Sequence, residues 1–306
     1  MTTEFKNELV IALKKNRPKL SANSLKTYVS TLTTLNRLLD GNSTVKWFSE
    51  EDTVNKIMEY LKSKTNVSRK TFLSACYVLT TNKVYHEQMI KDATDVNDNY
   101  KLQNKSVREE ENWVTPQEID EKYNELYNKA KLILSAKAPY DQATMNAYFM
   151  IASFHLMIPR RSMEYSLLKL KSYDEKTDNY YKSGKFYFNQ YKTAYKYGLQ
   201  IVDCPKELND MIKKYLKINN GEYLLQSKKG TPINSSAISK IFNGIFAPKK
   251  VSVDMIRHIY LSDKYKNLPE LESMLKTADA MGHSLGTALQ YVKKNSPKDE
   301  GKSDEK

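Results

Sequence analysis

The sequence predicts a mainly α-helical protein with two domains and a small antiparallel β-sheet. Apolar residues recur at three- and four-residue steps through most of the chain, as at Leu25, Val29 and Leu32, and this is the period of an amphipathic helix. Between 180 and 202, short aromatic and β-branched runs separated by turn residues predict strands instead. A polar stretch at 98–112 interrupts the helical pattern and predicts an exposed linker.

Residues 1–97 are predicted to form an all-helical domain. Ser21 or Asn23 is suited to cap its second helix. Arg69 and Lys70 stand at the start of its fourth helix, where free backbone N–H groups also favour phosphate, so both are candidate DNA contacts. The alternative is a bundle whose charged residues are simply solvated. The helices are expected at 5–15, from the Ser21 or Asn23 cap through Leu39, and at 50–62, 68–81 and 85–93.

A second domain is predicted at 113–295. Thr115, Pro116 and Glu118 form a helix start, in which Thr115 caps and Glu118 completes a capping box. The sequence Lys-Ser-Gly-Lys separates two aromatic runs and predicts a hairpin, with a third strand at 199–202. Helices are expected at 116–136, 140–157, 205–216, 235–246 and 284–294. The charged segment 296–306 is predicted to be a disordered tail.

The composition points to a polyanionic partner and away from several classes of protein. A formal charge of +13 in 306 residues favours nucleic acid, with a merely lysine-rich, solubilising surface as the alternative. The chain shows neither a bilayer-spanning apolar run nor a secretory signal, so an intracellular location is expected. Two isolated cysteines cannot build a disulfide framework or a zinc site. The chain has only nine glycines and no glycine-rich phosphate loop, and no histidine pair has metal-ligand spacing, so neither a nucleotide nor a metal cofactor is expected.

Breaking a DNA phosphodiester without a metal requires a nucleophile, cations for the transition-state charge, and an acid for the leaving 5′ oxygen. Tyrosine suits the nucleophile because its phosphate ester conserves the bond energy for religation. Arginine suits the clamp because its planar fork bonds two phosphate oxygens at once. Lysine suits the acid because it can lose a proton. The chain offers all three residue types in its second half.

The order of these residues resembles the active site of the tyrosine recombinase, or phage-integrase-like, family. Arg161 with Glu164 three residues later looks like the Arg-x-x-Glu motif that holds the family's first catalytic arginine. Lys192 lies at the end of a predicted strand, where the family keeps its catalytic lysine. Arg257, followed by a histidine, looks like the second catalytic arginine. Arg160 is the competitor of Arg161 and is expected to contact DNA.

The resemblance extends to the C-terminal part of the chain. His283, in a Gly-His-Ser sequence, resembles the family's Gly-His-Ser motif, and Tyr291 would then be the nucleophile. One position departs from the pattern, because Asp254 stands where the family usually has histidine. Asp254 and Arg257 share a helix face and could pair. The resemblance implies that Asp254 orients Arg257 or accepts a proton.

The resemblance covers nearly the whole chain and implies a site-specific DNA recombinase or integrase. It implies a SAM-like core-binding bundle and a catalytic domain that together form a C-shaped clamp on double-stranded DNA. A homotetramer on paired sites is expected, without membrane association. The motifs look closest to recombinases of eukaryotic viruses and mobile elements. The alternatives are a type IB topoisomerase, a catalytically inactive DNA-binding relative and a protelomerase-like enzyme, for which the chain is short.

Overall fold

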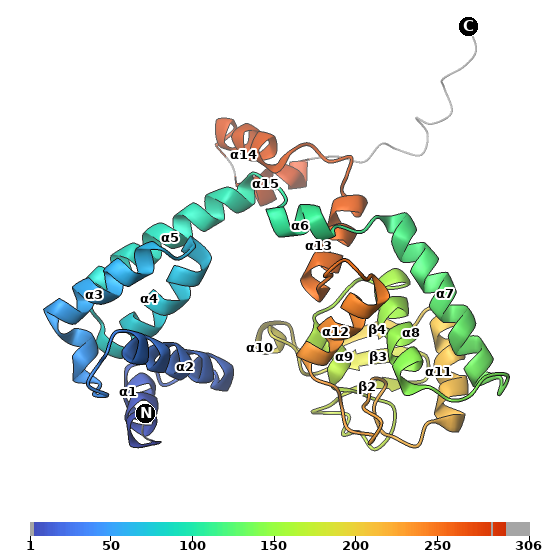
Figure 1. The fold of residues 1–306 in the computed structure, drawn as a ribbon. Helices are drawn as coiled ribbons and strands as arrows, with labels where there is room; N and C mark the ends of the chain where they lie inside the picture. The colour runs from blue at the N-terminus through green and yellow to red at the C-terminus, as the bar shows by residue number, and fades with distance from the viewer. Residues whose placement is uncertain (1–2, 283, 292–306) are drawn as a thin grey trace, which may run out of the picture. The chain divides into compact units, whose positions relative to one another are not determined.

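The computed structural model describes residues 3–282 and 284–291, and it divides into two compact units (Figure 1). The first unit combines Met1–Asn104 with Pro269–Lys306, and the second is Lys105–Leu268. The division after Asn104 lies inside the predicted linker. The grouping of the C-terminal segment with the first unit differs from the predicted catalytic domain of 113–295, so the domain boundaries stay a prediction.

The first unit is entirely helical in its described part. Ser21 caps the second helix, its side chain accepting the N–H of Ser24, which decides between the two predicted caps. The apolar faces of the first four α-helices meet in one core, where each fully buried large side chain contributes about 1.5–3 kcal/mol. Its elements are α1 (Thr3–Asn16), α2 (Ala22–Leu38), the 3-10 helix η1 (Lys46–Ser49), α3 (Glu51–Lys62), α4 (Asn66–Thr80), α5 (Lys83–Lys101), α14 (Leu271–Ala280) and α15 (Leu285–Tyr291).

The predicted linker is partly helical, which corrects the sequence interpretation. Helix α5 continues to Lys101, and a further helix α6 spans Val107–Asn112. A capping box formed by Ser106 and Glu109 stabilises the start of α6. Helix α6 buries no residue, so it leaves no apolar periodicity by which the sequence could reveal it.

The second unit is mainly helical, with one small sheet. Helix α8 is apolar on all sides and lies at the centre, packed against α7, α11 and α12. The capping box of Thr115 and Glu118 is present as predicted. The remaining elements are α7 (Pro116–Leu134), α8 (Gln142–His155), α9 (Ser162–Ser166), β1 (Leu168–Lys169), β2 (Asn179–Lys182), β3 (Lys185–Phe188), α10 (Ala194–Tyr197), β4 (Gln200–Asp203), α11 (Lys206–Ile218), α12 (Ser235–Ile245) and α13 (Val253–Lys264).

The sheet has the strand order β1-β2-β3-β4 and is mixed. Strands β2, β3 and β4 form the predicted antiparallel meander, whereas β1 pairs with β2 in parallel. The prediction of a purely antiparallel sheet is therefore wrong in this detail, because a two-residue strand is too short to show alternation. Ser183 and Gly184 both have positive φ, 51° and 80°, as a type I′ hairpin turn requires.

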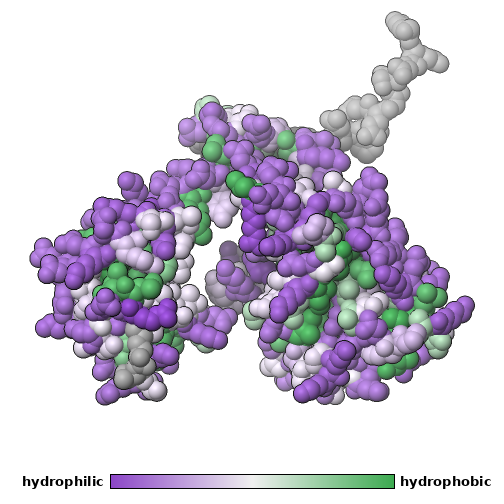
Figure 2. Space-filling model, viewed as in Figure 1, coloured by the Kyte–Doolittle hydropathy of each residue, from purple (hydrophilic) through white to green (hydrophobic). Residues whose placement is uncertain are grey.

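Hydrophilic residues cover most of the visible face of each unit, and apolar residues gather over α12 in the second (Figure 2). Within the described residues, no helix is long and apolar enough to cross a membrane. The predicted tail at 296–306 lies outside the described residues.

Candidate active site

The two neighbouring arginines before α9 have opposite environments. Arg160 donates from Nε to the carboxylate of the buried Glu164, and its guanidinium lies over the ring of Phe188 at 4.1 Å. Arg161 is the N-cap residue of α9 and is exposed. Among the described residues, no side chain pairs with the Arg161 guanidinium. The structure thus pairs Glu164 with Arg160, although the spacing favoured Arg161, and it leaves the Arg161 fork open to a ligand.

Lys192 is exposed and follows β3 in the connection to β4, rather than lying in a strand. The buried Asn179 of β2 links this connection to α9. Its Nδ2 donates to the carbonyls of Glu164 at 3.4 Å and Gln190 at 2.8 Å, while its Oδ1 accepts the N–H of Gln190 at 2.7 Å. The guanidinium of Arg160 also lies 5.5 Å from the ring of Tyr191. These contacts hold the base of the Lys192 connection against the segment that carries Arg161.

Arg257 lies on α13 and forms the predicted pair with Asp254, with 3.0 Å between Nη1 and Oδ1. The Asp254 side chain is 77% exposed, so the pair stands at the surface. The next residue, His258, points to α6, where its Nδ1 lies 2.7 Å from Oε1 of Glu109. The backbone N–H of Ser106 and then the His258 ring lower the pKa of Glu109 to about 2. His258 therefore anchors α13 to α6.

Tyr165 binds the backbone of the segment that carries Arg160 and Arg161. It is buried, and its hydroxyl oxygen accepts the backbone N–H of Arg160 at 3.3 Å. Burial raises the pKa of this hydroxyl, and the N–H of Arg160 and the charges of Arg160 and Arg257 oppose the rise. The Tyr165 hydroxyl thus binds the backbone just before α9, at the residue next to Arg161.

Two predicted residues belong to the C-terminal segment. Tyr291 is the last residue of α15 and is 59% exposed. It is grouped with the first unit, whereas Arg161, Lys192 and Arg257 belong to the second. His283 lies outside the described residues. The roles assigned to all of these side chains stay predictions.

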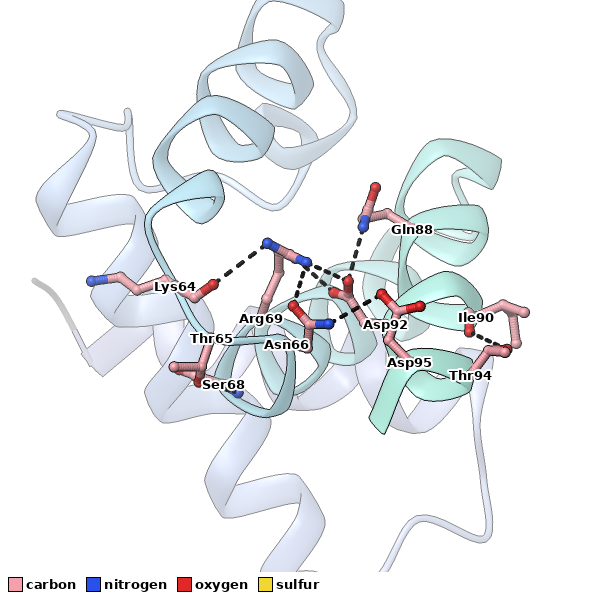
Figure 3. A network of polar contacts seen from close by, with 10 residues as sticks. All are labelled: Lys64, Thr65, Asn66, Ser68, Arg69, Gln88, Ile90, Asp92, Thr94 and Asp95. Carbon is pink, nitrogen blue, oxygen red and sulfur yellow. Dashed lines mark hydrogen bonds and ion pairs between the residues drawn. The ribbon is translucent and has the colours of Figure 1, made fainter. Parts of the chain in front are cut away.

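Arg69 has an internal partner (Figure 3). From α4, its Nε and Nη2 donate to the fully buried carboxylate of Asp92 on α5, at 2.7 and 2.5 Å. Nη2 also donates to Asn66 at 2.9 Å, and Gln88 donates to Asp92 at 2.9 Å. This network joins α4 to α5, so the Arg69 side chain stabilises the contact between these two helices. DNA contact by Arg69, and by the half-buried Lys70 beside it, stays a prediction.

Sequence reasoning missed the residues that support the candidate site. Asn179 and Tyr191 carry no motif and contact Glu164 and Arg160 from other segments of the chain, whereas Tyr165 contacts Arg160 only five residues before it. The one available signal was Asn179, because asparagine is unfavourable in a strand unless its side chain has backbone groups to bind. Among the described residues, no group of three or more His, Cys, Asp or Glu is placed to hold a metal ion.

Comparison with known proteins leaves the family open. No protein-family model matches the chain, and no curated protein matches it. Among solved structures, a crystal structure of XerA recombinase aligns with a TM-score of 0.35 and 14% sequence identity, over 96% of this chain and 95% of that one. A TM-score of this size marks a weak likeness, and the chemistry of the site rests on the residues described above.

Proposed function

We propose that the chain is a site-specific DNA recombinase that cuts and rejoins DNA through a tyrosyl intermediate. The Tyr291 hydroxyl oxygen attacks a backbone phosphorus and loses its proton. The bond between phosphorus and the 5′ oxygen breaks, which leaves a 3′-phosphotyrosyl link and a free 5′-hydroxyl. A 5′-hydroxyl of a partner strand then attacks the phosphotyrosine and releases the tyrosine. Both steps conserve the number of phosphoester bonds, so no external energy source is required.

The observation that carries this proposal is a pair of arginines in the second unit, Arg161 and Arg257, whose guanidinium groups have no buried partner among the described residues. Arg161 is exposed and without an internal partner among the described residues, and Arg257 is tied only to a surface carboxylate. Two forks of this kind suit the two non-bridging oxygens of a phosphoryl transition state. In the proposed reaction His283 assists them, and Asp254 orients Arg257.

Lys192 is the proposed acid. It is exposed on a connection that Asn179 and Arg160 hold next to the Arg161 segment, which supports this role. A positioned ammonium group can give a proton to the departing 5′ oxygen. The formal charge of +13 fits a double-stranded DNA partner, and assembly as a homotetramer on paired sites belongs to the same proposal.

The experiment is covalent trapping on DNA from the sequences that flank the gene. The duplex carries a nick just 3′ of the cleavage site. Cleavage therefore releases a short strand that carries the free 5′-hydroxyl, and because this strand diffuses away, religation stops. Wild type should give a DNA-linked band on denaturing gels, and Tyr291→Phe should give none. A band of equal intensity with Tyr291→Phe would rule out this nucleophile. Strand exchange between two duplexes, as against relaxation of one supercoiled plasmid, separates a recombinase from a type IB topoisomerase.

One observation favours a second candidate, a DNA-binding protein that does not cleave. Asp254 occupies one face of the Arg257 fork at 3.0 Å and adds a negative charge where a phosphate would bind. Such a protein would bind DNA with a steep salt dependence and form no covalent adduct with any substrate. Asp254→Asn would then strengthen DNA binding without creating cleavage.

A further inference from the structure

The connection between β3 and β4 exposes aromatic side chains for which the proposed reaction has no use. Tyr195 is 90% exposed, more than any other large hydrophobic side chain in the described part of the chain, and Tyr197 is 58% exposed. Both lie on α10, which stands at the edge of the second unit, away from the strands it joins (Figure 1). A single exposed ring is ordinary, but two exposed tyrosines on one four-residue helix place a large apolar area at one point of the surface.

The connection is held in a defined shape. The Tyr191 hydroxyl donates to the carbonyl of Gly198 at 2.6 Å, and the N–H of Gly198 donates to the carbonyl of Ala194 at 2.8 Å. Gly198 has φ of 65° and ψ of −157°, a positive-φ conformation that suits glycine. The ends of the connection are thus closed on each other, and Tyr195 is presented from a short, internally bonded turn.

The charge of the connection suits nucleic acid. Its sequence from 189 to 199, Asn-Gln-Tyr-Lys-Thr-Ala-Tyr-Lys-Tyr-Gly-Leu, holds two lysines and no acidic residue. Nζ of Lys196 lies 5.1 Å from the centre of the Tyr197 ring. Exposed aromatic rings among cations form stacking platforms for bases, because every base has a π face and every nucleotide a phosphate.

The position of Tyr195 ties this surface to the proposed chemistry. Tyr195 follows Lys192 by three residues, a span of about 10 Å at most in an extended chain. Successive bases of a strand are about 3.4 Å apart. If Lys192 serves the departing oxygen, the Tyr195 ring reaches bases within about three steps of the cleaved phosphate.

We propose that Tyr195 stacks on an unstacked base beside the cleaved phosphate, with Tyr197 and Lys196 flanking it. This inference rests on the proposed function for its location, but the stacking itself is a binding property that can be measured without cleavage. The other partner for an exposed aromatic turn is a second protein copy, which the same variants test.

The experiment uses the full chain with Tyr291→Phe, so that chemistry does not intervene. The probes are a duplex with a central two-nucleotide gap opposite 2-aminopurine and the same duplex fully paired. Tyr195→Ala should weaken binding to the gapped duplex about 5- to 150-fold, the range for one lost base stack, and change binding to the paired duplex less than about twofold. Tyr195→Trp should retain affinity and fluorescence quenching, and Tyr195→Leu should lose both.

A matched control is Tyr100→Ala, which removes another exposed tyrosine, 69% exposed on α5, and should leave both affinities unchanged. The proposal is overturned if Tyr195→Ala binds the gapped duplex as tightly as its parent, if Leu serves as well as Trp, or if the parent does not bind the gapped duplex. A change in sedimentation with unchanged DNA binding would assign the turn to protein contact instead. If wild type forms the covalent adduct but the Tyr195 variants bind DNA as their parent does, the proposed function holds and only the stacking proposal fails.

Discussion

At the scale of single residues, we expect Arg160 to stabilise the fold and Arg161 to take part in DNA cleavage. Arg160→Ala leaves the buried Glu164 without its partner, and we expect a loss of about 3–5 kcal/mol in the free energy of unfolding. Arg161→Ala removes an exposed side chain, so stability should change by less than about 0.5 kcal/mol while the cleavage rate falls about 10²- to 10³-fold. Denaturant unfolding and the trapping assay measure the two effects.

The two variants are each other's control, because they remove the same group one residue apart. If Arg161→Ala cleaves DNA at the wild-type rate, Arg161 is not a phosphate ligand. If Arg160→Ala is as stable as wild type, the pairing with Glu164 does not support the fold.

Lys192 allows a test of the acid role that is independent of DNA binding. Lys192→Ala should slow cleavage of ordinary DNA about 10²- to 10⁴-fold, because the 5′ oxygen leaves poorly without a proton. A substrate with sulfur in place of that bridging oxygen has a leaving group that needs no acid, so the variant should cleave it at nearly the wild-type rate.

The control for this test is Lys185→Ala, which removes an exposed lysine of β3 paired with Asp203. It should cleave both substrates as wild type does. An equal defect of Lys192→Ala on both substrates would mean that Lys192 binds DNA rather than donating a proton.

At the scale of elements, the Arg69–Asp92 pair joins α4 to α5. Burial alone would raise the pKa of Asp92, but hydrogen bonds from Arg69 and Gln88 lower it below its usual value. The pair therefore adds stability that is present above the ordinary aspartate pKa and is lost as the pH falls through the lowered one. Arg69→Ala should cost about 3–5 kcal/mol of unfolding free energy at neutral pH, because a buried carboxylate loses its partner.

Urea unfolding of Arg69→Ala, Asp92→Leu and the double variant Arg69→Met/Asp92→Leu checks this expectation. The double variant should be much less destabilised than Arg69→Ala, since it leaves no unpaired buried charge. Full stability of Arg69→Ala would show that its guanidinium is free for another ligand, as the predicted DNA contact requires.

The sequence predicted the elements whose signals are local. The capping box before α7, the Ser183–Gly184 hairpin and the apolar helix α8 each depend on a few neighbouring residues. Helix α6 and the two-residue strand β1 escaped prediction, because neither has an apolar pattern long enough to read.

The site was predictable only where a motif marks it. The choice between Arg160 and Arg161 depended on which side chain reaches Glu164, and sequence spacing allows both an i,i+3 and an i,i+4 pair. The support from Asn179 joins separate segments, which a pattern in one sequence cannot show. Asp254 and Arg257 were the exception, because their pairing lies within one helix turn.

At the scale of the whole molecule, the net charge fits the partner that the proposed function names. A charge of +13 favours DNA without choosing a sequence, and phosphate contacts make such binding depend steeply on salt. The central claim is that Tyr291 becomes covalently joined to DNA.

The most direct test is mass spectrometry of the trapped adduct after digestion with nuclease and trypsin. The tryptic peptide 277–293 contains Tyr291 and no other tyrosine, so its mass identifies the linked residue without ambiguity. We predict this peptide with a nucleotide attached through a 3′-phosphate on Tyr291. A nucleotide on another tyrosine peptide, or a DNA-bound protein whose peptides are all unmodified, would contradict the proposed mechanism.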